Sequence, residues 1–201
     1  MSASRQVRDD AAMDAQAVLQ VLDALEAAGI RPGITGGWGV DALLGRQTRD
    51  HRDLDIGVRD AQVATAVTVL QSLGYAVTAD ERPARIALAS GRGSVDIHPI
   101  EFDATGHGVQ QGFDGQTFEY PIGSLDADGT IGSRRVKVAT PELQLAFHSG
   151  YPPAPHDLQD VRALVMELGR RVPGTRAARR PHRPAIASRR SGGRRQPAIE
   201  R

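Results

Sequence analysis

Two aspartates, Asp53 and Asp55, stand one residue apart in an alternating polar and apolar segment, Asp53-Leu-Asp-Ile-Gly-Val58. Side chains two positions apart on a β-strand project to the same face, so we expect both carboxylates on one side and Leu54 and Ile56 in the core. Carboxylates this close repel each other unless a cation lies between them. Mg²⁺ binds such carboxylates together with water and substrate phosphates. The pair therefore predicts a metal site, and we expect two Mg²⁺ ions there.

A third carboxylate, Asp96, lies in a later strand-like segment, Ser94-Val-Asp-Ile-His-Pro-Ile100. The same alternation places Val95 and Ile97 toward the core, and Asp96 with His98 on the other face. If the two strands are neighbours, three carboxylates meet on one face of the sheet. Such a site suits in-line displacement assisted by metal ions that bridge the attacking and leaving oxygens. Asp96 is then either a third metal ligand or the general base.

A glycine turn and a basic loop precede the first carboxylate pair. Gly36 and Gly37 let the backbone approach a ligand closely, and a helix beginning at Trp38 would present free N–H groups to phosphate oxygens. The alternative for the glycine pair is an ordinary turn between a strand and a helix. Arginines of the following loop could bind the phosphates in bidentate fashion. The candidates for nucleotide binding are Gly36, Gly37, Trp38, Arg46, Thr48 and Arg49.

Seven more residues are candidates for contact with the second substrate or for support of the site: Asp41, His51, His98, His148, Tyr151, Asp157 and Asp160. We expect Asp41 to hydrogen-bond the basic loop and hold it in place, not to bind metal. Two histidines on separate elements, His51 and His98, favour orientation or substrate contact over a transition-metal site. Asp157 and Asp160 fall in the first turn of a helix, where acids interact favourably with the helix dipole, so capping alone could explain one of them.

The elements that must position these residues follow from periodicity and from turn residues. Helices are predicted over residues 9–28, 38–44, 60–73, 141–148 and 156–168. Strands are predicted over residues 54–58, 75–78, 85–89, 95–100, 117–120 and 135–138. This order indicates an α+β fold, with a mixed β-sheet, flanking helices and a helical part at the C-terminal end.

Composition limits the class of protein. The chain of 201 residues has no cysteine, which excludes a disulfide scaffold, a thiolate nucleophile and a cysteine-based zinc site. The first residues lack the apolar segment of a secretory signal, and no apolar run approaches the roughly 20 residues of a membrane-spanning helix. We expect a cytoplasmic protein that does not associate with membranes.

Charge divides the chain into an acidic body and a basic tail. Residues 170–201 contain eleven arginines and one acid, whereas residues 1–169 contain 14 basic and 23 acidic residues. The tail is rich in Pro, Gly and Ser and is predicted to be disordered. Contact with nucleic acid is the alternative for the tail alone, but no aromatic residue lies between its arginines. The predicted domain covers residues 1–169, with the catalytic sheet over about 30–100 and further strands and helices over about 115–169.

The chain resembles the small antibiotic nucleotidyltransferases, and most closely the short lincosamide nucleotidyltransferases. The resemblance extends over residues 14–168. It rests on four motifs: Gly36-Gly-Trp-Gly-Val-Asp41, Arg49-x-His-x-Asp-x-Asp55, Asp96-Ile-His-Pro-Ile100, and Gln144-Leu-x-Phe-His-Ser-Gly-Tyr151 with Asp157 and Asp160 beyond it. The aminoglycoside nucleotidyltransferases are similar over the first half.

The resemblance implies a nucleotidyltransferase-type mixed sheet and an enzyme that moves AMP from ATP to a hydroxyl of a small antibiotic, releasing pyrophosphate. By position, Asp53 and Asp55 would hold Mg²⁺, Asp96 would be the base or a third ligand, and the nucleotide would bind Gly36, Gly37 and Arg49. Two features depart from the family: His156 replaces a Lys or Arg, and the arginine-rich tail has no counterpart.

Two alternatives stay open. The same chemistry could serve an aminoglycoside or another cellular acceptor, because both antibiotic classes are basic and charge does not choose between them. A non-catalytic nucleotide-binding module could also keep this fold, although such a module has no need of Asp53, Asp55 and Asp96 together. The sequence leaves the oligomeric state open.

Overall fold

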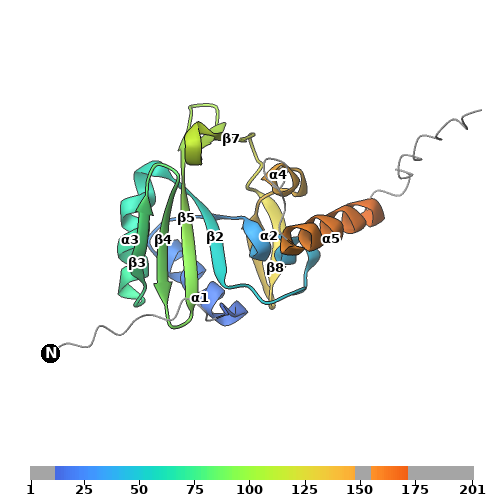
Figure 1. The fold of residues 1–201 in the computed structure, drawn as a ribbon, viewed down its shortest axis with the longest axis horizontal. Helices are drawn as coiled ribbons and strands as arrows, with labels where there is room; N and C mark the ends of the chain where they lie inside the picture. Colours follow the sequence, from blue (N-terminus) through green and yellow to red (C-terminus); the bar gives the residue numbers. More distant parts are fainter. Residues whose placement is uncertain (1–11, 148–154, 172–201) are drawn as a thin grey trace, which may run out of the picture.

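The computed structural model describes residues 12–147 and 155–171, and Figure 1 shows their arrangement. The predicted site residues His148 and Tyr151, and the basic tail from residue 172 onward, lie outside these ranges. The placement of the tail and its boundary with the domain therefore stay predictions. No helix in the two described ranges is both long and apolar enough to span a membrane.

A mixed β-sheet forms the centre of the fold, as predicted. Its main path has the order β3-β4-β5-β2-β1-β9-β8. The strands along this path are β3 (Ala76–Glu81), β4 (Arg85–Ser90), β5 (Gly93–Phe102), β2 (Asp53–Arg59), β1 (Gly33–Ile34), β9 (Arg134–Val138) and β8 (Ala127–Ile131). The β2–β5 and β1–β9 pairs are parallel and the other pairs on this path are antiparallel. Off the path, β6 (Gly108–Gln111) pairs with the end of β5, and β7 (Thr117–Tyr120) pairs with β6.

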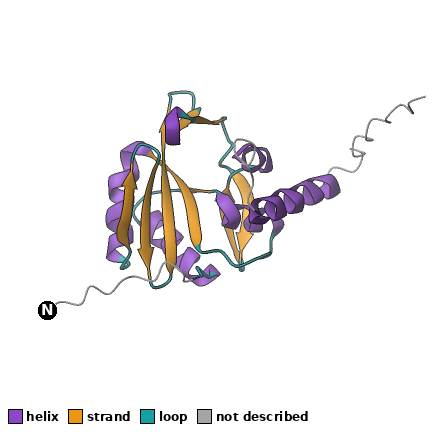
Figure 2. Cartoon of the chain, viewed as in Figure 1, coloured by secondary structure: helices purple, strands orange, loops and turns teal. Residues whose placement is uncertain are grey.

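The helices lie in two groups, which Figure 2 shows in purple on either side of the strands. α1 (Ala15–Ala27) contacts α3 (Val63–Ser72), which follows the short 3-10 turn η1 (Asp60–Gln62). α2 (Gly36–Leu44) contacts β8, α4 (Pro141–Phe147) and α5 (Pro155–Arg171). Consequently α5, at the C-terminal end of the described chain, packs against α2 and reaches Arg49 in the loop that follows it.

Alternating burial along β2 and β5 separates the core from the site. Leu54, Ile56, Val95 and Ile97 are completely buried in the main core, which agrees with the predicted side-chain alternation. The two strands pair in parallel so that Asp55 lies opposite Asp96. The prediction that the two acidic strands are neighbours is therefore confirmed.

Several element boundaries differ from the predictions. α1 begins at Ala15 and not near residue 9, because the Asp14 carboxylate accepts a hydrogen bond from the Ala17 N–H and caps the helix there. α2 begins at Gly36, two residues before the predicted start at Trp38. β6 and β8 were not predicted; both are short and contain glycine, and cross-strand pairing with β7 and β9 provides their hydrogen bonds.

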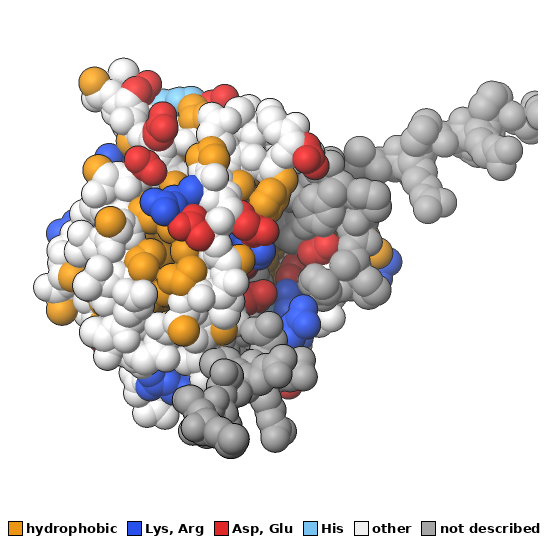
Figure 3. Space-filling view, turned by 60° about the vertical axis from the view of Figure 1, so that its left-hand side comes forward, with side chains coloured by type: hydrophobic (Ala, Val, Ile, Leu, Met, Phe, Trp, Pro, Cys, Tyr) orange, Lys and Arg blue, Asp and Glu red, His pale blue; other side chains and the backbone are white. Residues whose placement is uncertain are grey.

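The described surface mixes charges of both signs. On the face turned forward in Figure 3, basic side chains lie among acidic ones, next to a group of hydrophobic side chains. Among the described residues, Arg85 forms ion pairs with both Glu81 and Asp96. This face therefore has no broad patch of one charge to attract a polyanion.

Candidate active site

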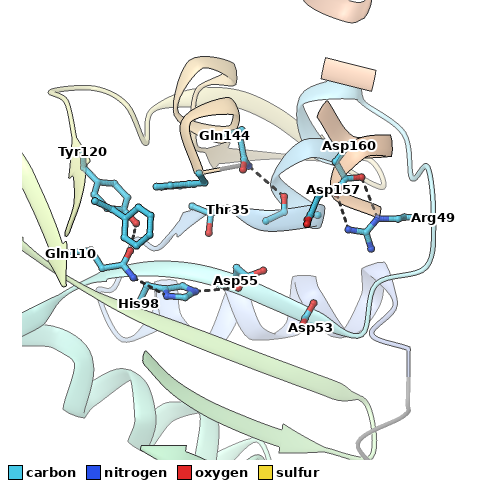
Figure 4. Close-up of a pocket in the computed structure, with 14 residues that line it drawn as sticks. Thr35, Arg49, Asp53, Asp55, His98, Gln110, Tyr120, Gln144, Asp157 and Asp160 are labelled. Atoms are coloured by element: carbon cyan, nitrogen blue, oxygen red, sulfur yellow. Dashed lines mark hydrogen bonds and ion pairs between the residues drawn. The ribbon is translucent and has the colours of Figure 1, made fainter. Parts of the chain in front are cut away.

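A cavity of about 320 Å³ lies between β2, the start of α2, the β6–β7 hairpin and the helices α4 and α5. Figure 4 shows its lining, which carries polar side chains from segments far apart in the sequence. The lining residues are Thr35, Gly36, Gly37, Arg49, Asp53, Asp55, His98, Gln110, Phe118, Tyr120, Gln144, Phe147, Asp157 and Asp160.

Asp53 and Asp55 lie side by side on β2 and both line the cavity. Desolvation by the surrounding protein, and then the neighbouring charge of Asp55, raise the pKa of Asp53 above its ordinary value. Arg52 and Arg49 oppose this shift without cancelling it. Burial and Asp55 together therefore outweigh the two arginines in setting the pKa of Asp53. Paired carboxylates of this kind are the ligands that a hard divalent cation takes.

Asp96 is paired with an arginine. Its Oδ2 accepts a hydrogen bond of 2.7 Å from Nη1 of Arg85, whose Nε and Nη2 bind Glu81. Burial and then the charge of Asp55 raise the pKa of Asp96, while Arg85 acts in the opposite direction.

The three carboxylates therefore lie on neighbouring strands, with Asp55 opposite Asp96, but they do not all point into the cavity as metal ligands would. Asp96 is not part of the cavity lining. Among the residues that the structure describes, no three acidic or histidine side chains are arranged to hold a metal ion. The positive charge next to Asp96 comes instead from Arg85, through their ion pair.

The glycine turn is built around the Asp55 carboxylate. Gly36 has a φ of +59°, in the left-handed region, and a Cβ added there would overlap Oδ2 of Asp55. A Cβ on Gly37 would overlap the His51 ring and approach Nη2 of Arg49 to 2.6 Å. Because neither glycine has a Cβ, the side chains of Asp55, His51 and Arg49 can lie against this turn. The same lack of a Cβ is what the predicted close approach of a ligand requires.

The buried carboxylate of Asp41 holds the basic loop, as predicted. It accepts hydrogen bonds from the backbone N–H of Thr48 at 3.1 Å, from the Thr48 hydroxyl at 2.5 Å, and it contacts Nε2 of His51 at 2.5 Å. Asp41 and His51 are both buried, and neither lines the cavity. Their position supports the loop that carries Arg49.

Three of the predicted nucleotide-binding side chains lie away from this cavity. The indole of Trp38 is buried in the core, with its ring centre 4.9 Å from that of His51. Thr48 is bound to Asp41. Arg46 lines a different hollow, together with residues of α5. Gly36, Gly37 and Arg49 do line the cavity.

Asp157 and Asp160 reach the cavity from the first turns of α5 and are both buried. Asp160 accepts two hydrogen bonds from Arg49, at 2.8 and 3.2 Å. Four aspartates and one arginine thus line the cavity, which makes it acidic.

One end of the cavity consists of aromatic and amide groups that were not predicted as site residues. The rings of Phe118 and Tyr120 lie 5.8 and 5.5 Å from the ring of Phe147. The hydroxyl of Tyr120 donates to Gln110 at 2.6 Å, and Gln110 contacts His98. The predicted strand over residues 117–120 already placed Phe118 and Tyr120 on one face, but nothing in the sequence assigned that face to the site.

Gln144, on α4, closes the cavity above the glycine turn. Its side chain is completely buried, and its Nε2 donates weakly to the carbonyl of Gly36 at 3.5 Å. Its Oε1 has no hydrogen-bond partner among the described residues. A Cβ on Gly39 would overlap Nε2 of Gln144, so glycine at that position also lets α4 approach α2.

A family model described as aminoglycoside-2''-adenylyltransferase matches residues 17–164, which is most of the chain. The chain belongs to the aminoglycoside-2''-adenylyltransferase family. It is therefore an antibiotic nucleotidyltransferase, and the predicted enzyme class and family resemblance are confirmed.

Relatives of this adenylyltransferase-family chain include a lincosamide resistance protein of Staphylococcus haemolyticus. The two are 31% identical over 145 residues, which cover 72% of this chain and 89% of the relative. The lincomycin-bound crystal structure of the lincosamide antibiotic adenylyltransferase LnuA has 29% identity and a TM-score of 0.69, covering 77% of this chain and 98% of LnuA. The structure of ANT(2'')-Ia with adenylyl-2''-tobramycin, at 22% identity and a TM-score of 0.63, covers 78% of this chain and 90% of ANT(2'')-Ia and shares the fold.

Proposed function

We propose that this enzyme transfers AMP from ATP to a hydroxyl of a lincosamide, with Mg²⁺, and releases pyrophosphate. One observation carries the proposal: the cavity has two chemically different ends. Asp53, Asp55, the glycine turn and Arg49 form a charged end, and the rings of Phe118, Tyr120 and Phe147 form an aromatic end. A nucleotide with its metal suits the first end, and a partly apolar acceptor suits the second.

Asp53 and Asp55 are the residues that would hold Mg²⁺. Their carboxylate oxygens fit a hard cation. Burial and then the charge of Asp55 raise the pKa of Asp53, and a bound cation would oppose both effects. When bound, the metal would neutralise the triphosphate and the charge that develops on the leaving pyrophosphate.

The nucleotide phosphates are expected next to the start of α2. The backbone N–H groups of the first turn of a helix attract anions, and Arg49 brings a guanidinium to the same turn, as its 2.6 Å approach to the Cβ position of Gly37 indicates. We therefore assign phosphate binding to Gly36, Gly37 and Arg49. The side chains of Trp38, Arg46 and Thr48 are left out of the proposal because other contacts occupy them or they face elsewhere.

The transfer forms one bond and breaks one. The acceptor hydroxyl oxygen attacks the α-phosphorus, the bond from that phosphorus to the bridging oxygen breaks, and pyrophosphate leaves with the electron pair. We assign the hydroxyl proton to Asp96, which lies opposite Asp55 in the strand register, beside the cavity and not in its lining. Burial and the charge of Asp55 raise the pKa of Asp96, which makes its carboxylate a stronger base. Orientation of the two substrates in one cavity would supply much of the rate gain.

The acceptor class follows from the lining of the cavity. Lincosamides carry one basic amine and an apolar part, which would match buried aspartates and aromatic rings together. The similarity to LnuA and to the lincosamide resistance protein supports the same assignment.

An aminoglycoside acceptor is the second candidate. It is favoured by the four aspartates of the cavity, which suit a polycation, and by the description of the matching family. Such a polycation would gain less than a lincosamide from packing against the three aromatic rings.

The deciding experiment measures pyrophosphate release from ATP and Mg²⁺ with lincomycin, clindamycin and several aminoglycosides in turn. Release with lincosamides alone, absent in Asp53→Asn, is the expected result, and mass spectrometry of the product would locate the AMP. Release with aminoglycosides alone would refute the lincosamide as acceptor but would still support transfer of AMP from ATP. Binding of Mg-ATP without release for any acceptor would contradict antibiotic transfer.

A further inference from the structure

Four side chains form a continuous line of hydrogen bonds from the aromatic end of the cavity to the charged end (Figure 4). The Tyr120 hydroxyl donates to Oε1 of Gln110 at 2.6 Å. Nε2 of Gln110 lies 3.1 Å from Nδ1 of His98, and Nε2 of His98 lies 3.1 Å from Oδ1 of Asp55. The line joins β7, β6, β5 and β2, which are consecutive neighbours in the sheet.

The direction of each hydrogen bond follows from the donors and acceptors present. Nε2 of Gln110 also donates to the carbonyl of Ala84, at 3.3 Å, and a carbonyl can only accept. The amide is therefore oriented with its oxygen toward Tyr120 and its nitrogen toward His98. Nδ1 of a neutral His98 then accepts, so its proton is on Nε2, where it is donated to Asp55.

This arrangement orients the Asp55 carboxylate. His98 occupies Oδ1, while Oδ2 faces the glycine turn, at the place where a Cβ of Gly36 would lie. Gln110 and Tyr120 are almost completely buried, so their orientation is restricted by packing as well as by hydrogen bonds. Outer hydrogen bonds of this kind orient the ligands of metal sites and tune their affinity.

We propose that Tyr120, Gln110 and His98 act as positioning residues that set the orientation of Asp55 as a metal ligand. The inference rests on the proposed function, because it requires a divalent ion at Asp53 and Asp55. None of the three residues needs to touch the reacting atoms. Their effect is on the affinity of the metal site and reaches it through Oδ1 of Asp55.

The test measures Mn²⁺ binding by electron paramagnetic resonance, with and without ATP, in Tyr120→Phe and Gln110→Met. Gln110→Met keeps the shape of the side chain and removes both hydrogen bonds to the line, so we expect the Kd for Mn²⁺ to rise about tenfold. Tyr120→Phe removes only the hydroxyl at the end of the line farthest from Asp55, so we expect a smaller rise in the Kd for Mn²⁺, of about threefold. Nitrogen NMR of the neutral imidazole should find the Nε2–H form of His98 in the wild type, and a mixture of forms in Gln110→Met.

Tyr75→Phe is the matched control. Tyr75 is also buried, and its hydroxyl bonds a serine, Ser90, outside the cavity. The control should lower the melting temperature without changing the Kd for Mn²⁺. If Gln110→Met does not fold, the titration of Tyr120→Phe decides alone, because that change keeps the ring.

The outcomes separate the two proposals. Unchanged Mn²⁺ affinity in folded Tyr120→Phe and Gln110→Met, with only a lower melting temperature, would overturn the positioning role and leave the proposed function intact. Absence of Mn²⁺ binding in the wild type, even with ATP, would overturn the metal site and the proposed function together.

Discussion

Arg49 and Asp160 join the loop after α2 to helix α5 across 111 positions of sequence. Nε and Nη2 of Arg49 both donate to the Asp160 carboxylate, at 3.2 and 2.8 Å, and Asp160 is buried. Such a two-point contact restricts both the position and the plane of the guanidinium. Burial of Arg49 disfavours its charge, but the hydrogen bond and the charge of Asp160 outweigh it and raise the pKa of Arg49. The arginine assigned to the phosphates is thus held in place by a residue of the C-terminal helix.

Replacing Asp160 with Asn should weaken nucleotide binding. The amide keeps the size of the side chain but loses the charge and one of the two acceptors, so Arg49 is no longer fixed over the glycine turn. We expect the KM for ATP to rise about five- to tenfold, corresponding to roughly 1–1.4 kcal/mol. Steady-state kinetics would measure it, with Asp128→Asn as the control, because Asp128 forms an exposed ion pair with Lys137 outside the cavity. An unchanged KM would show that Arg49 does not depend on this contact.

Replacing Asp53 with Asn should lower turnover strongly and leave the fold intact. A lost metal ligand costs several kcal/mol of transition-state stabilisation, so the rate should fall on the order of 100- to 1,000-fold. Because desolvation and Asp55 raise the pKa of Asp53, the ionised carboxylate is unfavourable in the folded protein without metal. The melting temperature of the metal-free variant should therefore equal or exceed that of the wild type. A folded variant with full activity would refute the metal assignment.

Replacing Gly36 with Ala should damage both stability and activity, whereas Gly45→Ala should affect stability alone. Both glycines have a φ in the left-handed region, +59° and +67°, which costs an alanine roughly 1–2 kcal/mol. Only at Gly36 would the added methyl meet Asp55; at Gly45 it meets nothing within 4 Å. Urea unfolding and turnover, measured for both variants, would isolate the effect of displacing Asp55. Equal activity losses in the two variants would contradict this role of the turn.

The stabilisation by Mg²⁺ should depend on pH. The pKa values of Asp53 and Asp96 are both raised, in each case first by burial and then by Asp55. A raised pKa in the folded state means that the folded protein binds the proton more tightly than the unfolded chain does. Protonation of these two carboxyls therefore favours the folded state at low pH, and this stabilisation is lost as the pH rises through the folded pKa. At neutral pH the carboxylates are ionised and repel one another, and a bound cation relieves that repulsion.

Thermal unfolding with and without Mg²⁺, from about pH 4 to about pH 8, measures this dependence. The gain in melting temperature on adding Mg²⁺ should be largest near neutral pH and shrink as the pH falls through the raised pKa values. In Asp53→Asn, the gain in melting temperature on adding Mg²⁺ should be small and should vary little with pH. A gain that is constant over the whole range would place the cation elsewhere.

The alternation along β2 and β5 was enough to predict which carboxylates share a face. Leu54, Ile56, Val95 and Ile97 could only be buried, so Asp53, Asp55 and Asp96 had to project from the other side. Asp41 as the anchor of the basic loop could also be inferred, because it lies only seven positions before Thr48. These are short-range relationships, which depend on the period of a strand or helix and on the reach of a nearby side chain.

The remaining relationships depend on pairings between distant segments. Gln110 and Tyr120 enter the site because β6 and β7 pair onto the end of β5, and Asp160 enters because α5 packs against α2. Trp38 was expected at the nucleotide, but packing turns its ring into the core. Arg85, from β4, binds Asp96 through antiparallel pairing with β5. Periodicity determines which face of an element a residue occupies, whereas the neighbour across that face is chosen by burial and hydrogen bonding summed over the whole fold.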